Sequence, residues 1–88
     1  MINYELGQIV KSIAGRDMEQ YFIVVQVDEQ YLYLVDGKSR RLEVPKKKKK
    51  KHVQITHGVA QGIADKLSND DKLSNAEIRR SLKDFQKL

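Results

Sequence analysis

The chain of 88 residues contains no cysteine and no tryptophan, and only one proline. Without cysteine it has neither a disulfide framework nor a thiolate nucleophile, so a metal site would depend on two histidines, His52 and His57. No stretch approaches the roughly 18 apolar residues of a membrane-spanning helix, and the N-terminus lacks the basic and apolar regions of a signal peptide. We therefore expect one small cytoplasmic domain with no membrane association.

Patterns typical of catalysis are also missing from the sequence. The two histidines are five positions apart and have no dense cluster of carboxylates beside them. There is no glycine-rich phosphate loop, no activated nucleophile and no paired carboxylate that would suit acid–base chemistry. We predict that the protein is not an enzyme and needs neither a metal ion nor a cofactor.

Positive charge is concentrated in six consecutive lysines, residues 46–51, directly after Pro45. Residues 1–45 carry five Lys or Arg against seven Asp or Glu, and residues 52–88 carry six against five, so the lysines exceed the whole net charge of +5. Because a run this dense repels itself, we predict a solvated basic loop, residues 45–52. Such a loop is either a linker or targeting patch, or a surface that contacts the phosphates of a polyanion without reading its sequence.

Short segments rich in β-branched and aromatic residues alternate with turn residues in the first half of the chain. They predict five strands, at residues 8–13, 21–27, 31–35, 40–44 and 52–55. The second segment is apolar enough to be buried on both faces. Strands this short predict a small barrel rather than a large sheet.

The apolar spacing becomes helical in the second half. Val59, Ile63 and Leu67 recur at i, i+4 and i+8, and Thr56 is the expected N-cap of this helix. Ser74 and Glu77 fit a capping box for a second helix, with Leu73 preceding it as a hydrophobic staple. We expect a barrel at residues 1–56 and a two-helix appendage at residues 57–88. The buried stripe of the second helix is predicted to be Ile78, Leu82 and Phe85.

The stretch Leu6-Gly7-Gln8-Ile9-Val10-Lys11-Ser12-Ile13-Ala14-Gly15-Arg16-Asp17, followed by Phe22-Ile23-Val24-Val25, resembles the KOW motif of ribosomal and transcription-associated proteins. The resemblance implies a five-stranded SH3-like barrel followed by a helical hairpin. It also implies an RNA-binding protein of translation that is associated with the ribosome and contacts structured RNA through the basic loop and the KOW hairpin, with ribosomal RNA and ribosomal proteins as partners. Further segments resemble a bacterial subgroup that is similar to large-subunit ribosomal KOW proteins of archaea and eukaryotes: Val35-Asp36-Gly37, Arg40-Arg41-Leu42-Glu43, Pro45 with its lysines, His52 and Asn75-Ala76-Glu77-Ile78-Arg79.

One position departs from the KOW pattern. KOW hairpins usually carry another glycine about two residues after the Asp, whereas this chain reads Met18-Glu19-Gln20. If the turn requires a positive φ at Glu19, the non-glycine residue costs on the order of 1 kcal/mol.

The residues expected to contact RNA are basic and lie on or beside the turns and the lysine loop. For Arg16, the alternative is an internal ion pair with a nearby carboxylate. Tyr31 and Tyr33 share a strand face and either stack on unpaired bases or pack under the helices. The expected set is Arg16, Lys38, Arg40, Arg41, Lys46, Lys47, Lys48, Lys49, Lys50, Lys51 and His52.

A protein-interaction module is the alternative function. In that case the barrel groove or the helical hairpin would bind another polypeptide of the translation or transcription machinery, since small barrels serve both roles.

Overall fold

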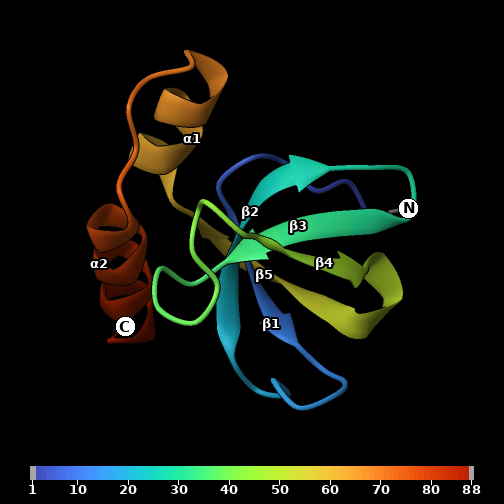
Figure 1. Ribbon diagram of the computed structural model, residues 1–88. Helices are drawn as coiled ribbons and strands as arrows, with labels where there is room; N and C mark the ends of the chain where they lie inside the picture. Colours follow the sequence, from blue (N-terminus) through green and yellow to red (C-terminus); the bar gives the residue numbers. More distant parts are fainter. Residues whose placement is uncertain (1, 88) are drawn as a thin grey trace.

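The computed structural model describes residues 2–87, which form five strands, one short 3-10 turn and two helices (Figure 1). All five strands belong to one antiparallel sheet with the order β4-β3-β2-β1-β5. The predicted fold class, mainly β with five strands followed by two C-terminal helices, is confirmed. No helix within the described residues has the length and apolar character needed to cross a membrane. The elements are β1 Gln8–Ser12, β2 Tyr21–Val27, β3 Tyr31–Val35, β4 Lys46–Lys49, η1 Lys50–His52, β5 Val53–Val59, α1 Gln61–Ser68 and α2 Asn75–Gln86.

The sheet curls because its two edge strands are neighbours in the chain. β4 and β5 occupy opposite edges of the sheet, yet only the three residues of η1 separate them. The sheet must bend until these edges approach each other, as the ribbon shows (Figure 1). Alternate side chains of each strand then point into the barrel or away from it. The interior holds Val10, Phe22, Val24, Leu32, Leu34 and Val53.

A second apolar core lies between the outer face of the sheet and the helices. Ile9, Ile23 and Val35 of the sheet pack there against Ile63 of α1 and against α2. β2 therefore contributes to both cores, as its composition predicted. The α2 residues buried in this core are Ile78 and Leu82, with Phe85 packed against it.

α2 begins as the capping box predicts. The Ser74 side chain accepts a hydrogen bond from the Glu77 backbone, and the Glu77 carboxylate accepts one from the Ser74 backbone at 2.8 Å. Leu73 packs against the cluster that contains Ile78, which agrees with the predicted staple.

The prediction for the start of α1 was wrong. Thr56 does not cap a helix but lies in β5, where its hydroxyl donates to the Ile9 carbonyl at 2.7 Å. Pairing with β1 extends β5 to Val59, and α1 follows after Ala60, whose side chain makes no capping bond. Positions 56 and 57, between which the barrel and the helical appendage were divided, both lie inside β5.

The predicted strand at residues 40–44 is also wrong, because side chains rather than a neighbouring strand bind its backbone. Asp36 accepts from the backbone N–H groups of Lys38 at 2.9 Å and Arg40 at 2.8 Å, which bends the chain into a turn. Asn75 of α2 accepts from the Leu42 backbone at 2.8 Å. The segment is therefore an ordered loop fixed to the beginning of α2.

Two glycines allow this close packing. A Cβ on Gly37, whose φ is +79°, would lie 2.5 Å from the Asn75 carbonyl oxygen. A Cβ on Gly58 of β5 would lie 2.4 Å from the Phe85 ring, whereas Gly62 has nothing within 4 Å. Gly58 therefore allows α2 to lie close to the sheet, whereas Gly62 serves no such contact.

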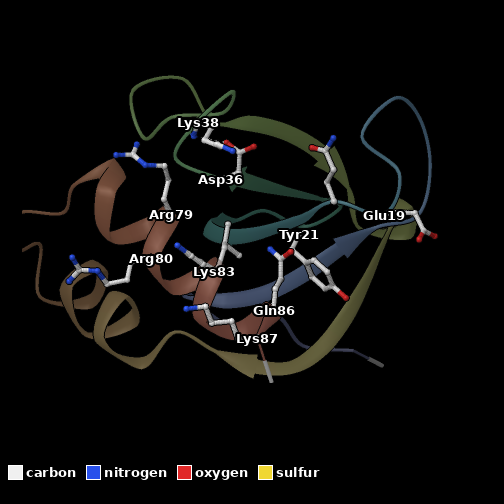
Figure 2. A pocket seen from close by; sticks show the side chains of 11 residues that line it. Glu19, Tyr21, Asp36, Lys38, Arg79, Arg80, Lys83, Gln86 and Lys87 are labelled. Carbon is white, nitrogen blue, oxygen red and sulfur yellow. Dashed lines mark hydrogen bonds between the residues drawn. The ribbon is translucent and has the colours of Figure 1, made fainter.

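α2 and the beginning of β2 border an open cleft of about 930 Å³ (Figure 2). Tyr21, Leu82, Asp36 and Lys38 are among the residues that line it. Most of the charged side chains around it are basic.

Candidate nucleic-acid interface

The lysine run is not a solvated loop. Its first four residues form β4, which pairs with β3, and the last two begin η1. Consecutive strand residues point to opposite faces, so the alternation divides the lysines into two pairs and reduces their mutual repulsion. Lys46 and Lys48 lie opposite Leu34 and Leu32, whose side chains fill the barrel. Lys46 and Lys48 therefore need a nearby group of opposite charge.

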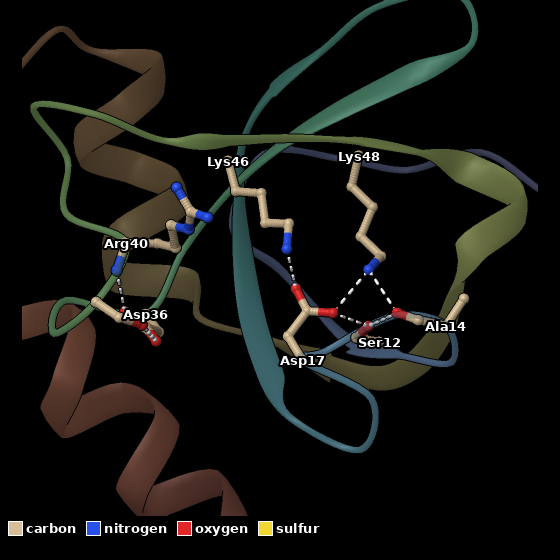
Figure 3. Close-up of polar contacts among 8 residues, drawn as sticks. Ser12, Ala14, Asp17, Asp36, Arg40, Lys46 and Lys48 are labelled. Carbon is tan, nitrogen blue, oxygen red and sulfur yellow. Dashed lines mark hydrogen bonds and ion pairs between the residues drawn. The ribbon is translucent and has the colours of Figure 1, made fainter.

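That partner is Asp17, in the loop between β1 and β2 (Figure 3). Lys46 Nζ lies 2.6 Å from Asp17 Oδ2, and Lys48 Nζ lies 2.7 Å from Oδ1. Lys48 also donates to the Ala14 carbonyl at 2.8 Å, and the Ser12 hydroxyl donates to Asp17 Oδ1 at 2.6 Å. The side chains of Lys48 and Asp17 are only 8% and 10% exposed. We call this group the Asp17 clamp.

The clamp keeps Asp17 ionised. Burial by itself raises the pKa of the Asp17 carboxyl, but hydrogen bonds from Lys46, Lys48 and Ser12 outweigh burial and hold that pKa well below its ordinary value. The clamp links β4 to a loop that is not its neighbour in the sheet. Two of the predicted RNA-binding lysines therefore have a structural role.

Lys47 and Lys49 point the other way and share the outer face of the sheet with two tyrosines. In the β3–β4 register Tyr33 lies opposite Lys47, and Tyr31 lies opposite Lys49. Both lysines are exposed and both tyrosines are half-buried. The Lys47 ammonium lies 4.4 Å from the centroid of the Tyr31 ring, within the range of a cation–π contact. We call these four residues the lysine–tyrosine face.

The tyrosines do not lie under the helices. Val35, on the same side of β3, belongs to the helix-covered core, whereas Tyr31 and Tyr33 are absent from that core within residues 2–87. The Tyr33 hydroxyl donates to Asp28 at 3.2 Å, which fixes one end of the ring. Of the two interpretations left open by the sequence, packing under the helices is therefore ruled out.

η1 continues the basic surface beyond β4. Lys50 donates to the Glu29 carbonyl at 2.9 Å, so its position is fixed at the β2–β3 turn. Lys51 is exposed and His52 is half-buried. These residues extend positive charge from the lysine–tyrosine face toward β5.

Arg16 lies in the β1–β2 loop beside the Asp17 clamp and is exposed. Among the described residues 2–87 it takes part in no ion pair, because Asp17 is bound by Lys46 and Lys48 instead. The internal pairing considered for Arg16 is not formed.

Lys38, Arg40 and Arg41 lie in the loop that leads from β3 to β4. The backbone of Lys38 and Arg40 binds Asp36, which leaves the Lys38 side chain exposed and that of Arg40 half-buried. Arg41 is exposed. The fold brings these residues to the connection between the cleft and β4, not onto the lysine–tyrosine face.

Sequence reasoning missed the basic side of α2. Arg79, Arg80, Lys83 and Lys87 line the cleft together with Lys38 (Figure 2). Their spacing of three, four and seven positions was a readable signal for one side of a helix. No such signal existed for the inward lysines, since their direction depends on the register between β3 and β4.

A metal centre has no support from the side-chain arrangement. Within residues 2–87 no three His, Asp or Glu side chains come together in a group that could hold a metal ion. His57 lies beside the Phe85 ring, with the ring centroids 5.7 Å apart, and His52 is in η1.

No family model and no curated protein sequence matches the chain. The KOW resemblance therefore depends on the residues quoted for it, and function must be inferred from the surface itself.

Proposed function

We propose that this protein binds RNA through the lysine–tyrosine face. The observation that carries the proposal is the β3–β4 register, which brings two half-buried rings and two exposed ammonium groups onto one surface of the sheet. Aromatic rings provide stacking platforms for unpaired bases, and neighbouring cations bind the backbone phosphates. The combination suits single-stranded RNA better than a duplex, whose bases are already stacked.

Occupation of the Tyr31 ring by Lys47 does not prevent base stacking. An exposed cation–π contact stabilises by about 0.5–1 kcal/mol. A base stacked on an aromatic side chain contributes about 1–3 kcal/mol. A base therefore displaces the Lys47 ammonium at a net gain, and the displaced group remains close to the phosphate of the same nucleotide.

The KOW resemblance extends the proposal to the ribosome. It supports an SH3-like barrel that contacts ribosomal RNA in the cytoplasm, and association with ribosomal subunits in a salt-graded sedimentation gradient tests that extension. Docking of the helices onto a partner protein is less favoured, because Ile63, Ile78 and Leu82 are buried against the chain's own sheet.

Salt dependence of the affinity tests the proposed RNA site. Two of the six lysines are held by Asp17, so three or four remain to neutralise phosphates. For single-stranded RNA of about six nucleotides, log affinity should fall with log salt at a slope of about −2 to −3, at roughly 0.7 per phosphate. Fluorescence anisotropy with a labelled oligonucleotide measures this slope. A slope near zero, or equal binding of a duplex of the same length, would contradict the proposal.

A further inference from the structure

The cleft beside α2 carries more positive charge than the fold neutralises. Five cations line it: Lys38, Arg79, Arg80, Lys83 and Lys87. Within residues 2–87 none of them belongs to an ion pair. The two carboxylates at its edge, Glu19 and Asp36, leave a net surplus of three positive charges among the lining residues.

Neither carboxylate is available to the cleft cations. Asp36 already accepts from the backbone of Lys38 and Arg40 and from the Ser39 hydroxyl at 2.9 Å. Glu19 pairs with Lys11 at 3.8 Å and not with a cation of the cleft. Neither of these carboxylates therefore forms an ion pair with the cations that line the cleft.

Helix stability alone accounts for only part of this charge. Lys83 and Lys87 lie near the C-terminal end of α2, where positive charge interacts favourably with the helix dipole. Arg79 has a structural role, because its Nη1 donates to the Gly37 carbonyl at 2.7 Å. Arg80 lies in the first half of the helix, away from the end where the dipole favours positive charge. Arg79 with Lys83, and Lys83 with Lys87, are like-charge pairs at i, i+4, an arrangement that destabilises a helix, and the single opposite-charge pair at this spacing on the same side, Arg80 with Asp84, offsets only part of it. A bound polyanion would relieve this repulsion.

The position of the cleft relative to β4 indicates which polyanion. One loop, residues 36–45, leads from the cleft to the first lysine of β4, and it carries Lys38, Arg40 and Arg41 along its length. The molecule measures 29 Å in its longest direction. A strand that keeps the stacked rise of roughly 3.4 Å per nucleotide spans that distance with about nine nucleotides.

We propose that the α2 cleft is a second RNA site, which binds the phosphodiester backbone of a strand whose bases contact the lysine–tyrosine face. Arginine guanidinium groups bind phosphate oxygens with two parallel hydrogen bonds, and the volume of about 930 Å³ admits a short stretch of backbone. This inference rests on the proposed RNA-binding function. It adds a second contact that raises the affinity only of RNA long enough to reach both sites.

Amide shifts of the uniformly ¹⁵N-labelled full chain distinguish the two sites. With single-stranded RNA of about 15 nucleotides, we expect shifts at Arg80 and Lys83 as well as at Lys47 and Lys49. Shifts at the β4 residues alone would overturn the cleft proposal and leave the lysine–tyrosine face standing. Shifts at the cleft alone would contradict the lysine–tyrosine face and, with it, the strand shared between the two sites, and no shift at either would overturn both.

A pair of variants gives an independent readout. Arg80→Ser/Lys83→Ser should weaken binding of the longer RNA by about tenfold and leave binding of the six-nucleotide RNA within about twofold. Lys72→Ser, an exposed lysine between the helices that does not line the cleft, is the matched control and should change neither. Equal losses for short and long RNA would overturn the two-site arrangement. If a poly-glutamate peptide binds the cleft more tightly than RNA does, the partner is an acidic protein. That result would also overturn the proposed RNA site.

Discussion

At the scale of single residues, Asp17 decides how the lysine strand is built. Its carboxylate binds one lysine on each oxygen and also accepts from Ser12, so a buried charge has its hydrogen bonds satisfied. Burying an ion pair costs solvation energy. Removing one of the two partners leaves the other as an uncompensated buried charge. Asp17 was not among the residues singled out from the sequence for this role.

Replacement of Asp17 tests the clamp through pH. The folded-state pKa of Asp17 lies below its unfolded value of about 3.9, so its stabilisation is present above that pH and is lost as pH falls below it. Asp17→Asn should lower the free energy of unfolding by about 3 kcal/mol at neutral pH and flatten its decline in acid. Urea denaturation at a series of pH values measures both effects.

The matched control for this prediction is Asp84→Asn, an exposed carboxylate on α2. It should leave the free energy of unfolding at neutral pH nearly unchanged. A residual acid dependence in Asp17→Asn is expected from Asp36: burial raises its pKa, but hydrogen bonds from Arg40, Lys38 and Ser39 lower it overall. If Asp17→Asn and the parent protein lose stability in parallel as pH falls, the clamp does not stabilise the fold.

Glu19 shows a local strain at the position where the sequence departs from the KOW pattern. Its φ is +77°, so the turn does require the left-handed conformation at this position. A residue with a Cβ there costs about 1 kcal/mol relative to glycine. The Asp17 clamp fixes the adjacent chain, and this holds Glu19 in the left-handed conformation despite the cost.

At the scale of elements, the sequence predicted best where local signals agree with the final packing. The capping box of Ser74 and the doubly buried strand β2 follow from nearby residues and were predicted with the correct position. β4 was missed because six like charges argue against a strand unless a distant carboxylate neutralises alternate members. The prediction of a strand at residues 40–44 was wrong for a similar reason, since the side chains of Asp36 and Asn75 bind the backbone of this segment.

The contact between α2 and β5 supplies a prediction at this scale. Gly58→Ala would force a Cβ to within 2.4 Å of the Phe85 ring, so the helix or the ring must move. We expect a loss of about 1–3 kcal/mol in the free energy of unfolding, as for other overpacked sites. Differential scanning calorimetry or urea denaturation measures the change.

Gly62→Ala is the opposite case within the same region. Gly62 is exposed in the first turn of α1, and a methyl group added there would have nothing within 4 Å, so alanine should stabilise by about 0.5–1 kcal/mol. Destabilisation by both substitutions, or by neither, would show that the close approach of α2 to Gly58 is not what limits that position.

At the scale of the whole molecule, a curled sheet with a helix-covered patch leaves one strand pair open on its outer face. The helices cover Ile9, Ile23 and Val35, and the Asp17 clamp draws alternate lysines inward. The lysine–tyrosine face lies outside the part of the sheet that the helices cover. The sequence supplied the charge and the two tyrosines, but only the strand register determines which lysines can reach a ligand.

The central claim is therefore that neighbouring lysines of β4 have different roles. Lys46→Ser and Lys47→Ser remove the same charge one position apart, and Lys46→Ser keeps the bond between Lys48 and Asp17. The most direct test is the slope of log affinity for the six-nucleotide RNA against log salt in these two variants. Lys47→Ser should make the slope shallower by roughly 0.7 and lower the affinity several-fold, whereas Lys46→Ser should leave the slope unchanged. Equal changes in both variants would contradict the account, because they would mean that charge alone, and not the face on which it lies, governs binding.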